Sequence, residues 1–154
     1  MKKKIKTILI GLGNIGMECD LNNDKIISHS KAILKDPRLE FCCAVDVDLK
    51  KIKKFEARYK IKGLTNLNNA LKIYKPHLLV IAIKNNNVKG VFEKIKKHES
   101  IKYIILEKPG AKNYRELKKI IKLTSQRKIK LFINYNRTYQ EKYLDIFKEY
   151  RKAK

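Results

Sequence analysis

A glycine-rich turn near the N-terminus, directly after a short apolar strand, constrains the fold of this chain more than any other stretch. Residues 8–10 form a continuous apolar run, as in strands covered on both faces of a parallel sheet. Gly11, Gly13 and Gly16 follow with the spacing G-x-G-x-x-G. Such glycines permit a tight turn, close approach of a pyrophosphate to the backbone, and close packing of helix on strand. The stretch predicts a dinucleotide site, although three glycines in six residues can also form a simple turn.

The length of 154 residues fits one domain that buries a core without disulfides or metals. No apolar stretch approaches the ~18 residues of a membrane span. The start, Met1 to Lys4 followed by an apolar run, imitates a secretory leader, but glycines interrupt the run and acidic residues follow it. Cys19, Cys42 and Cys43 have no metal-binding spacing, and adjacency in a strand predicts that Cys42 and Cys43 point to opposite faces. We therefore expect a cytoplasmic protein with reduced thiols, no metal site and no membrane segment.

The net charge of +23, from 38 basic and 15 acidic residues, is large enough to attract nucleic acid or anionic surfaces. The basic residues are mostly lysines scattered over every predicted helix, and the aromatic residues do not interleave with them as a stacking platform requires. We therefore expect no specific nucleic-acid partner. A basic nucleic-acid-binding protein remains a less favoured alternative.

Hydrophobic periodicity predicts six strands that alternate with helices. The strands are expected at 4–10, 39–46, 60–62, 77–83, 102–107 and 129–135, and the helices at 28–34, 49–59, 66–74, 88–98, 113–127 and from about 140 to 154. After Gly16 we expect one short helical turn and an inserted loop before the first crossover helix, which Ser28 would cap. The alternation predicts an α/β fold: a doubly wound, mostly parallel six-stranded sheet with helices on both faces.

Polar side chains gather where the predicted strands end, which is where doubly wound sheets bind ligands. Asp46 closes the second strand and is positioned to accept the ribose hydroxyls of a dinucleotide, although it could instead cap the next helix. Residues 84–87, Lys-Asn-Asn-Asn, form the predicted loop after the fourth strand, and residues 107–109, Glu-Lys-Pro, end the fifth. His77 begins the fourth strand, far from this edge, and is expected to be structural.

Four segments together resemble the Gfo/Idh/MocA family, the relatives of glucose–fructose oxidoreductase and inositol dehydrogenase. They are Gly-Leu-Gly-Asn-Ile-Gly at 11–16, Val-Asp at 45–46, Glu-Lys-Pro at 107–109 and Asn-Tyr-Asn-Arg-x-Tyr at 134–139. The resemblance covers about residues 3–140 and implies a Rossmann domain that binds a nicotinamide dinucleotide. It also implies hydride exchange with a secondary alcohol of a sugar or cyclitol.

The resemblance also implies roles for individual residues. Lys108 would be the catalytic residue that contacts the reacting hydroxyl, and Asn134 and Arg137 would face the substrate. The Lys108–Pro109 peptide bond would be cis. The cofactor is NAD or NADP, with NAD favoured by the acid at 46. Its contacts would be Gly11, Gly13, Asn14, Ile15, Gly16, Asp46, Asn85, Glu107, Lys108 and Pro109.

This chain departs from the family pattern in two respects that bear on function. The family usually has Thr-Pro and a nearby histidine after the fourth strand, where this chain has residues 84–87. Family enzymes also continue into an open antiparallel sheet that binds substrate. We therefore expect residues 1–138 to be the dinucleotide-binding domain and 139–154 to begin a helix toward a missing substrate domain. The isolated chain would then be inactive and could associate through the uncovered sheet edge. A non-catalytic nucleotide-binding or partner-binding module is the alternative.

Overall fold

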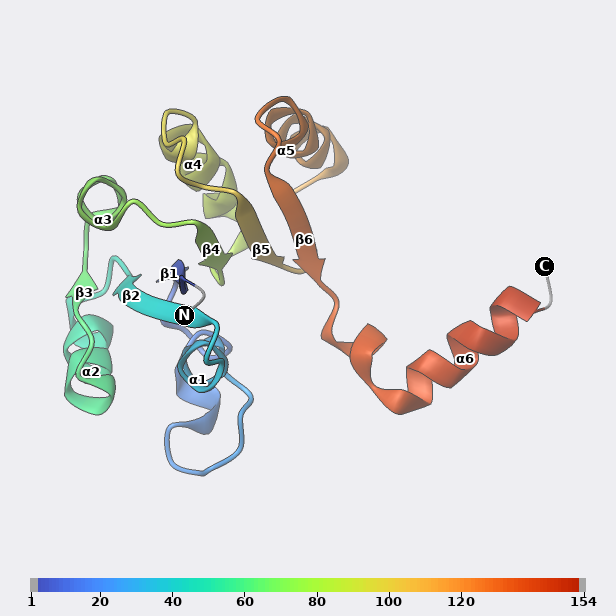
Figure 1. Cartoon of the computed structure of the whole chain (residues 1–154), viewed down its shortest axis with the longest axis horizontal. Coiled ribbons are helices and arrows are strands. Elements are labelled where there is room, and N and C mark those ends of the chain that lie inside the picture. Colours follow the sequence, from blue (N-terminus) through green and yellow to red (C-terminus); the bar gives the residue numbers. More distant parts are fainter. Residues whose placement is uncertain (1–2, 153–154) are drawn as a thin grey trace.

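The computed structural model describes the backbone of residues 3–152, and the side chains of these except 138, 139, 142, 147 and 152 (Figure 1). Met1 and Lys2 of the leader-like start, and the last two residues of the predicted final helix, lie outside the described residues. The strands are β1 (Ile5–Ile10), β2 (Leu39–Val45), β3 (Gly63–Leu64), β4 (Leu78–Ile81), β5 (Tyr103–Glu107) and β6 (Lys130–Asn134). The helices are η1 (Glu18–Asp20), α1 (His29–Lys35), α2 (Leu49–Tyr59), α3 (Leu67–Tyr74), α4 (Asn85–Ile95), α5 (Tyr114–Gln126), η2 (Asn136–Tyr139) and α6 (Glu141–Lys152).

The strands form one sheet in the order β3-β2-β1-β4-β5-β6, and neighbouring strands of the described sheet are parallel. Alternate residues of β1, β4 and β5 supply two separate cores, one on each face of the sheet. Ile8 and Ile104 belong to the core under α3, α4 and α5, whereas Leu9 and Val80 belong to the core under α1 and α2. The predicted doubly wound sheet with helices on both faces is confirmed.

Polar caps set where the helices begin. Ser28 accepts a hydrogen bond from the amide of Lys31, as predicted, and the same kind of bond starts α2 at Asp48, α3 at Asn66 and α5 at Asn113. His77 has the structural role expected of it, because its Nδ1 accepts a hydrogen bond from the amide of Lys6 across the sheet.

The third strand lies later than predicted. Residues 60–62 are not a strand, because Lys60, directly after α2, caps the helix with a left-handed backbone, φ +56°. The chain pairs with β2 only at Gly63 and Leu64. A Cβ on Gly63 would lie 2.7 Å from Cγ2 of Ile52, so the glycine lets this strand pack closely on α2. The apolar Ile61 suggested a strand, but the geometry of the helix end decided its position.

The predicted alternation of Cys42 and Cys43 is wrong. The register between β1 and β2 shifts between Thr7 and Ile8, which pair with Phe41 and Cys43, so Cys42 is an extra residue in β2. A bulge of this kind places two successive side chains on one side. Cys42 and Cys43 accordingly both contact the core under α3, α4 and α5.

The C-terminal part of the chain is the least enclosed. β6 is an edge strand, and α6 extends away from the sheet (Figure 1). The Phe132 side chain on β6 is 51% exposed, and Leu144, Ile146 and Tyr150 on α6 are also exposed. No helix within residues 3–152 has both the length and the apolar character needed to cross a bilayer.

Candidate functional site

The parallel strands bring their carboxyl ends to one edge of the sheet, as predicted. This edge carries the glycine-rich turn after β1, Asp46 after β2, the start of α4 after β4, and residues 107–109 at the end of β5. Only β4 lies between β1 and β5, which separates their ends by about 10 Å. Gly13 and Lys108 therefore lie at this same carboxyl edge of the sheet, which we call the rim.

The three glycines of the turn have different packing environments. A Cβ on Gly11, whose φ is +100°, would lie 2.3 Å from the carbonyl oxygen of Ala82. A Cβ on Gly16 would lie 2.1 Å from the carbonyl oxygen of Gly11. At Gly13 the nearest atom to a Cβ would be Nζ of Lys51, at 3.9 Å. The fold itself therefore requires Gly11 and Gly16, whereas Gly13 borders open space.

The turn presents backbone donors to that space. Within the described residues, no hydrogen bond is made by the amides of Gly13, Asn14, Ile15 and Gly16. The carbonyls of Gly13 and Asn14 instead accept from Met17 and Cys19, which closes one helical turn. Successive unpaired amides at the start of a helical turn form an anion-binding concavity.

The inserted loop behind this turn is held by Asp20. Its fully buried carboxylate accepts hydrogen bonds from the amides of Ile27 at 2.8 Å and Ser28 at 2.7 Å. Burial opposes ionisation, but these hydrogen bonds and the nearby Lys31 ammonium outweigh it and keep the pKa of Asp20 below its usual value. The predicted short helical turn followed by a loop is therefore confirmed, with Asp20 closing the loop.

Asp46 joins the end of β2 to the glycine-rich turn. Its Oδ2 accepts a hydrogen bond from the amide of Leu12 at 2.6 Å, and its Oδ1 accepts one from the amide of Asp48 at 2.9 Å. Asp48, not Asp46, caps α2. Each carboxylate oxygen of Asp46 keeps a further lone pair, so the group can also accept from ligand hydroxyls.

Beside Asp46, a hollow of about 440 Å³ opens between the ends of β1 and β2 and one face of α4. The Val47 side chain, which is 91% exposed, lines it, as does Gly90, where a Cβ would meet no atom within 4 Å. The remaining lining residues are Ile10, Gly11, Val45, Asp46, Thr65, Leu67, Ile83, Asn86, Asn87, Val91 and Lys94. The hollow combines apolar walls with a few polar groups, as small-molecule sites do.

The asparagine run after β4 differs from the expected loop. Residues 85–87 are not a loop, because α4 begins at Asn85. The amide of Asn87 donates to the carbonyl of Lys84, which continues the helix into the asparagine run. Asn86 and Asn87 line the hollow, whereas Asn85 does not.

A hydrogen-bonded cluster surrounds Glu107 at the end of β5. Its Oε1 lies 2.8 Å from Nε2 of His29 and accepts a hydrogen bond from Nδ2 of Asn134 at 2.5 Å. The side chains of His29 and Glu107 are each 14% exposed. The next peptide bond, Lys108–Pro109, is cis as expected, and Lys108 is exposed at the rim.

Sequence analysis did not identify His29. Its amide donates to the carbonyl of Ile15 at 2.9 Å, while its ring contacts Glu107. One residue therefore connects the glycine-rich turn to the end of the strand that carries Lys108. The separation of 78 residues between His29 and Glu107 explains why no local pattern in the sequence indicated this contact.

The remaining candidates differ in their surroundings. Arg137 lies exposed on η2, beyond the end of β6. The described residues contain no cluster of histidine, cysteine and carboxylate side chains that could hold a metal ion. The three thiols are free; burial, with a smaller effect of Cys42, raises the pKa of Cys43 to about 12. These groups add no metal or reactive thiol to the rim.

Comparison with known proteins gives a family match and a set of similar structures. The family model GFO_IDH_MocA, described as an oxidoreductase family with an NAD-binding Rossmann fold, matches residues 5–135. No curated protein matches the sequence.

Three solved structures illustrate the similarity. The WlbA dehydrogenase from Bordetella pertussis, in complex with NADH and UDP-GlcNAcA, is 18% identical with a TM-score of 0.83 over 98% of this chain. Myo-inositol 2-dehydrogenase from Lactobacillus plantarum is 14% identical, with a TM-score of 0.81 over 98%. An oxidoreductase from Agrobacterium radiobacter in complex with NAD+, L-tartaric acid and magnesium is 19% identical, with a TM-score of 0.76 over 90%. This chain spans 43%, 42% and 37% of their respective lengths.

Proposed function

Because the chain belongs to the Gfo/Idh/MocA oxidoreductase family, as its NAD-binding Rossmann domain, we propose that it serves hydride transfer between a nicotinamide dinucleotide and a secondary alcohol. The alcohol would belong to a sugar or cyclitol, the class that the names of similar structures include. Since the chain spans about two-fifths of those proteins, it would provide the cofactor half of the active site.

The residues at the rim suggest how the cofactor would lie. The unpaired amides of residues 13–16 would bind the pyrophosphate, because they combine free donors with the space at Gly13. Asp46 would accept the adenosine ribose hydroxyls, and the adenine would lie in the hollow against Val47. The carboxylate favours NAD, since it would repel the 2′-phosphate of NADP, whereas the Lys51 ammonium near Gly13 reduces that preference.

Lys108 would act on the substrate. A bound nicotinamide supplies or accepts the hydride. An ammonium at this position donates a hydrogen bond to the substrate oxygen, which polarises a carbonyl or orients the proton that leaves an alcohol. Glu107 would position the end of β5, because its Oε1 contacts both His29 and Asn134. Asn134 would thus support the strand end, and Arg137 is the remaining candidate for substrate contact.

The His29 contact is the observation that supports this assignment most directly. A hydride can pass only if the cofactor and the acid–base group are held in fixed relation to each other. His29 bonds to Ile15 in the turn proposed to bind pyrophosphate and to Glu107, the neighbour of Lys108. The relation between the two halves of the rim is therefore set before any ligand arrives.

We extend the proposal to the organisation of the protein. Residues 1–138 would form the cofactor domain, and 139–154 would lead toward a substrate-binding domain that packs on the exposed side of β6 near Phe132. Glu107, Pro109 and Asn85 would lie at the nicotinamide end of the rim. The three free thiols are consistent with a reducing, cytoplasmic location.

Lysine labelling with and without cofactor tests the assignment. The chain is acetylated under limiting reagent, with and without saturating NADH, and each lysine is quantified by peptide mass spectrometry. We expect NADH to protect Lys108 and Lys51 and to leave the exposed Lys53 and Lys122 unchanged. Equal modification of Lys108 in both samples would remove it from the cofactor site.

Catalysis is tested separately. Lys108→Met should leave NADH affinity within about twofold while abolishing sugar-dependent NAD+ reduction in the protein supplied with its substrate domain. Retention of that activity by the variant would refute the catalytic role without affecting the cofactor site.

A further inference from the structure

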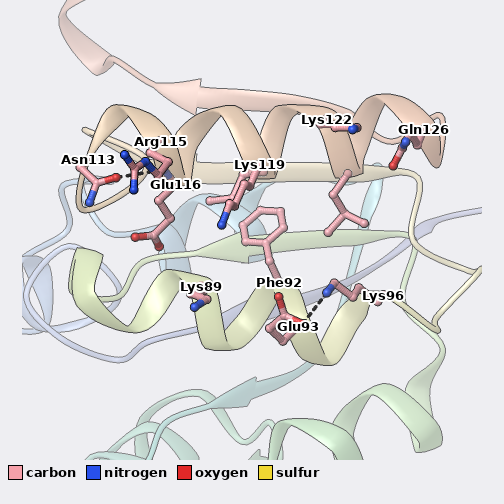
Figure 2. A pocket seen from close by; sticks show the side chains of 12 residues that line it. Lys89, Phe92, Glu93, Lys96, Asn113, Arg115, Glu116, Lys119, Lys122 and Gln126 are labelled. Atoms are coloured by element: carbon pink, nitrogen blue, oxygen red, sulfur yellow. Dashed lines mark hydrogen bonds and ion pairs between the residues drawn. The ribbon is translucent and has the colours of Figure 1, made fainter.

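A groove with a volume of about 430 Å³ runs between α4 and α5, on the face of the sheet opposite α1 and α2 (Figure 2). Its floor is apolar. Phe92 from α4 and Ile120 from α5 are each only 3% exposed, and the partly buried Leu123 continues the floor along α5. The groove therefore offers apolar surface to a side chain that enters between the helices.

The rim of the groove is strongly basic. Two acids, Glu93 and Glu116, accompany five cationic side chains: Lys89, Lys96, Arg115, Lys119 and Lys122. Glu93 is neutralised locally by an ion pair with Lys96. The hydrogen bond from Lys96, together with its charge and those of Lys89 and Lys119, lowers the pKa of Glu93. Positive charge from both helices thus acts across the groove.

Glu116 leaves an acceptor inside the groove. Figure 2 shows its side chain extending from α5 toward α4. Its Oε1 is buried and has no hydrogen-bond partner among the described residues. A buried acceptor without a partner costs free energy, which an occupant with an N–H or O–H group would recover.

The groove is held in shape without an occupant. Arg127, which follows α5, donates from Nη1 to the carbonyls of Ile95 and Lys96, and from Nη2 to that of His98. These bonds fix the last turn of α4 to the end of α5. A groove that is already formed binds with less ordering cost.

We propose that the α4–α5 groove docks an acidic segment of another protein, which inserts an apolar side chain toward Phe92 and Ile120. The apolar floor binds the anchor, the five cations attract the flanking carboxylates, and a backbone N–H of the segment reaches Glu116. This is the helix-in-groove or extended-peptide mode of recognition with acidic specificity.

The charges argue against two other occupants. A second copy of this chain carries 38 basic and 15 acidic residues, so it would be repelled by the cationic side chains around the groove. A nucleic acid, whose backbone carries phosphates and no apolar anchor, would leave the apolar floor without a partner.

The groove and the cofactor hollow use opposite sides of α4. Gly90, Val91 and Lys94 line the hollow, whereas Lys89, Phe92 and Glu93 line the groove. The docking proposal therefore does not depend on the proposed function, and either can fail alone.

Titration with a defined peptide tests the docking site. The probe is a fluorescein-labelled peptide of about 12 residues, three helical turns, composed of glutamate with leucine at i, i+3 and i+7. A second probe replaces the leucines with glutamine at the same charge. We expect the leucine peptide to bind with micromolar affinity, at least about tenfold tighter than the second probe, and to shift the amide NMR signals of α4 and α5.

Charge reversal supplies the matched control. Lys89→Glu with Lys119→Glu should weaken peptide binding by about tenfold, because each change replaces an attraction with a repulsion. Lys53→Glu with Lys54→Glu, on exposed positions of α2, alters the net charge equally and should change binding less than twofold. Lys89→Gln with Lys119→Gln, a milder pair, should give an intermediate loss.

Four results would overturn the proposal: no binding of the leucine peptide, equal binding of the two probes, equal effects of the two charge-reversed pairs, or tighter binding of a DNA oligonucleotide at the same amides. The first two would remove the apolar anchor. The third would reduce the interaction to net charge, and the fourth would assign the groove to nucleic acid.

Discussion

A methyl group added at Gly13 should separate cofactor binding from folding. An alanine Cβ there would lie 3.9 Å from Nζ of Lys51, with no closer contact in the fold. The backbone φ at Gly13 is outside the left-handed range, so alanine reduces the freedom of the unfolded chain and stabilises by about 0.4–1 kcal/mol. The melting temperature should therefore stay the same or rise by a few degrees.

NADH binding should respond in the opposite direction. The same methyl group would occupy the space in which we place the pyrophosphate, and would push the phosphates away from the amides of Asn14 and Ile15. Loss of close backbone contact should lower the affinity for NADH at least about tenfold, which corresponds to about 1.4 kcal/mol of binding free energy. A fluorescence titration with NADH measures the affinity, and circular dichroism measures the melting temperature of the same sample.

Gly16→Ala is the matched comparison. Its Cβ would lie 2.1 Å from the carbonyl oxygen and 3.0 Å from the carbonyl carbon of Gly11, and backbone atoms cannot rotate away. We expect a loss of about 3 kcal/mol, at the upper end of overpacking costs, and a fall in melting temperature of about 6–12 °C. Wild-type NADH affinity in Gly13→Ala would refute the placement of the pyrophosphate. Equal destabilisation by both substitutions would refute the packing argument.

Three further predictions concern the groups around the rim. Asp46→Ala should weaken the binding of NADH more than that of NADPH, because it removes both the acceptor of the ribose hydroxyls and the repulsion of a 2′-phosphate. Parallel titrations with the two cofactors measure this, and an equal loss of affinity for both would contradict it. His29→Ala should lower the melting temperature by about 2–6 °C, since it leaves the mostly buried Glu107 with one hydrogen bond fewer. His29→Gln should restore part of this loss. An unchanged melting temperature in His29→Ala would contradict the stabilising role of the contact. Because the pKa of Asp20 is lowered in the folded state, its carboxylate should stabilise the fold at neutral pH, and this stabilisation should be lost as pH falls below about 4. Urea titrations at several pH values should show a smaller acid-induced loss of stability in Asp20→Asn than in the wild type. Identical pH profiles of the two proteins would contradict this.

Much of the fold was predictable because local signals agree with the tertiary structure. The continuous apolar run at 8–10 is buried on both faces, and Ser28, which we expected to cap a helix, does so. The rim followed from the same reasoning, since parallel strands must bring their carboxyl ends together. The family match over residues 5–135 confirms the resemblance first noted from four short segments.

The failed predictions depended on partners that a linear pattern does not contain. The bulge at Cys42 is set by its register with β1, and the position of β3 by the left-handed end of α2 at Lys60. The asparagine run from Asn85 favours a loop by composition, yet it forms the first turn of α4. His29 contacts Glu107 across the fold, and their proximity requires the complete sheet.

α4 is a common wall between two chambers, with Gly90 on one side and Phe92 on the other. If a ligand in either cavity displaces α4, the width of the other cavity changes as well. Thermodynamic linkage then requires a reciprocal effect. NADH must change the affinity for an acidic peptide by the same factor by which the peptide changes the affinity for NADH. A domain of this size would then report its redox cofactor to another protein through the displacement of a single helix.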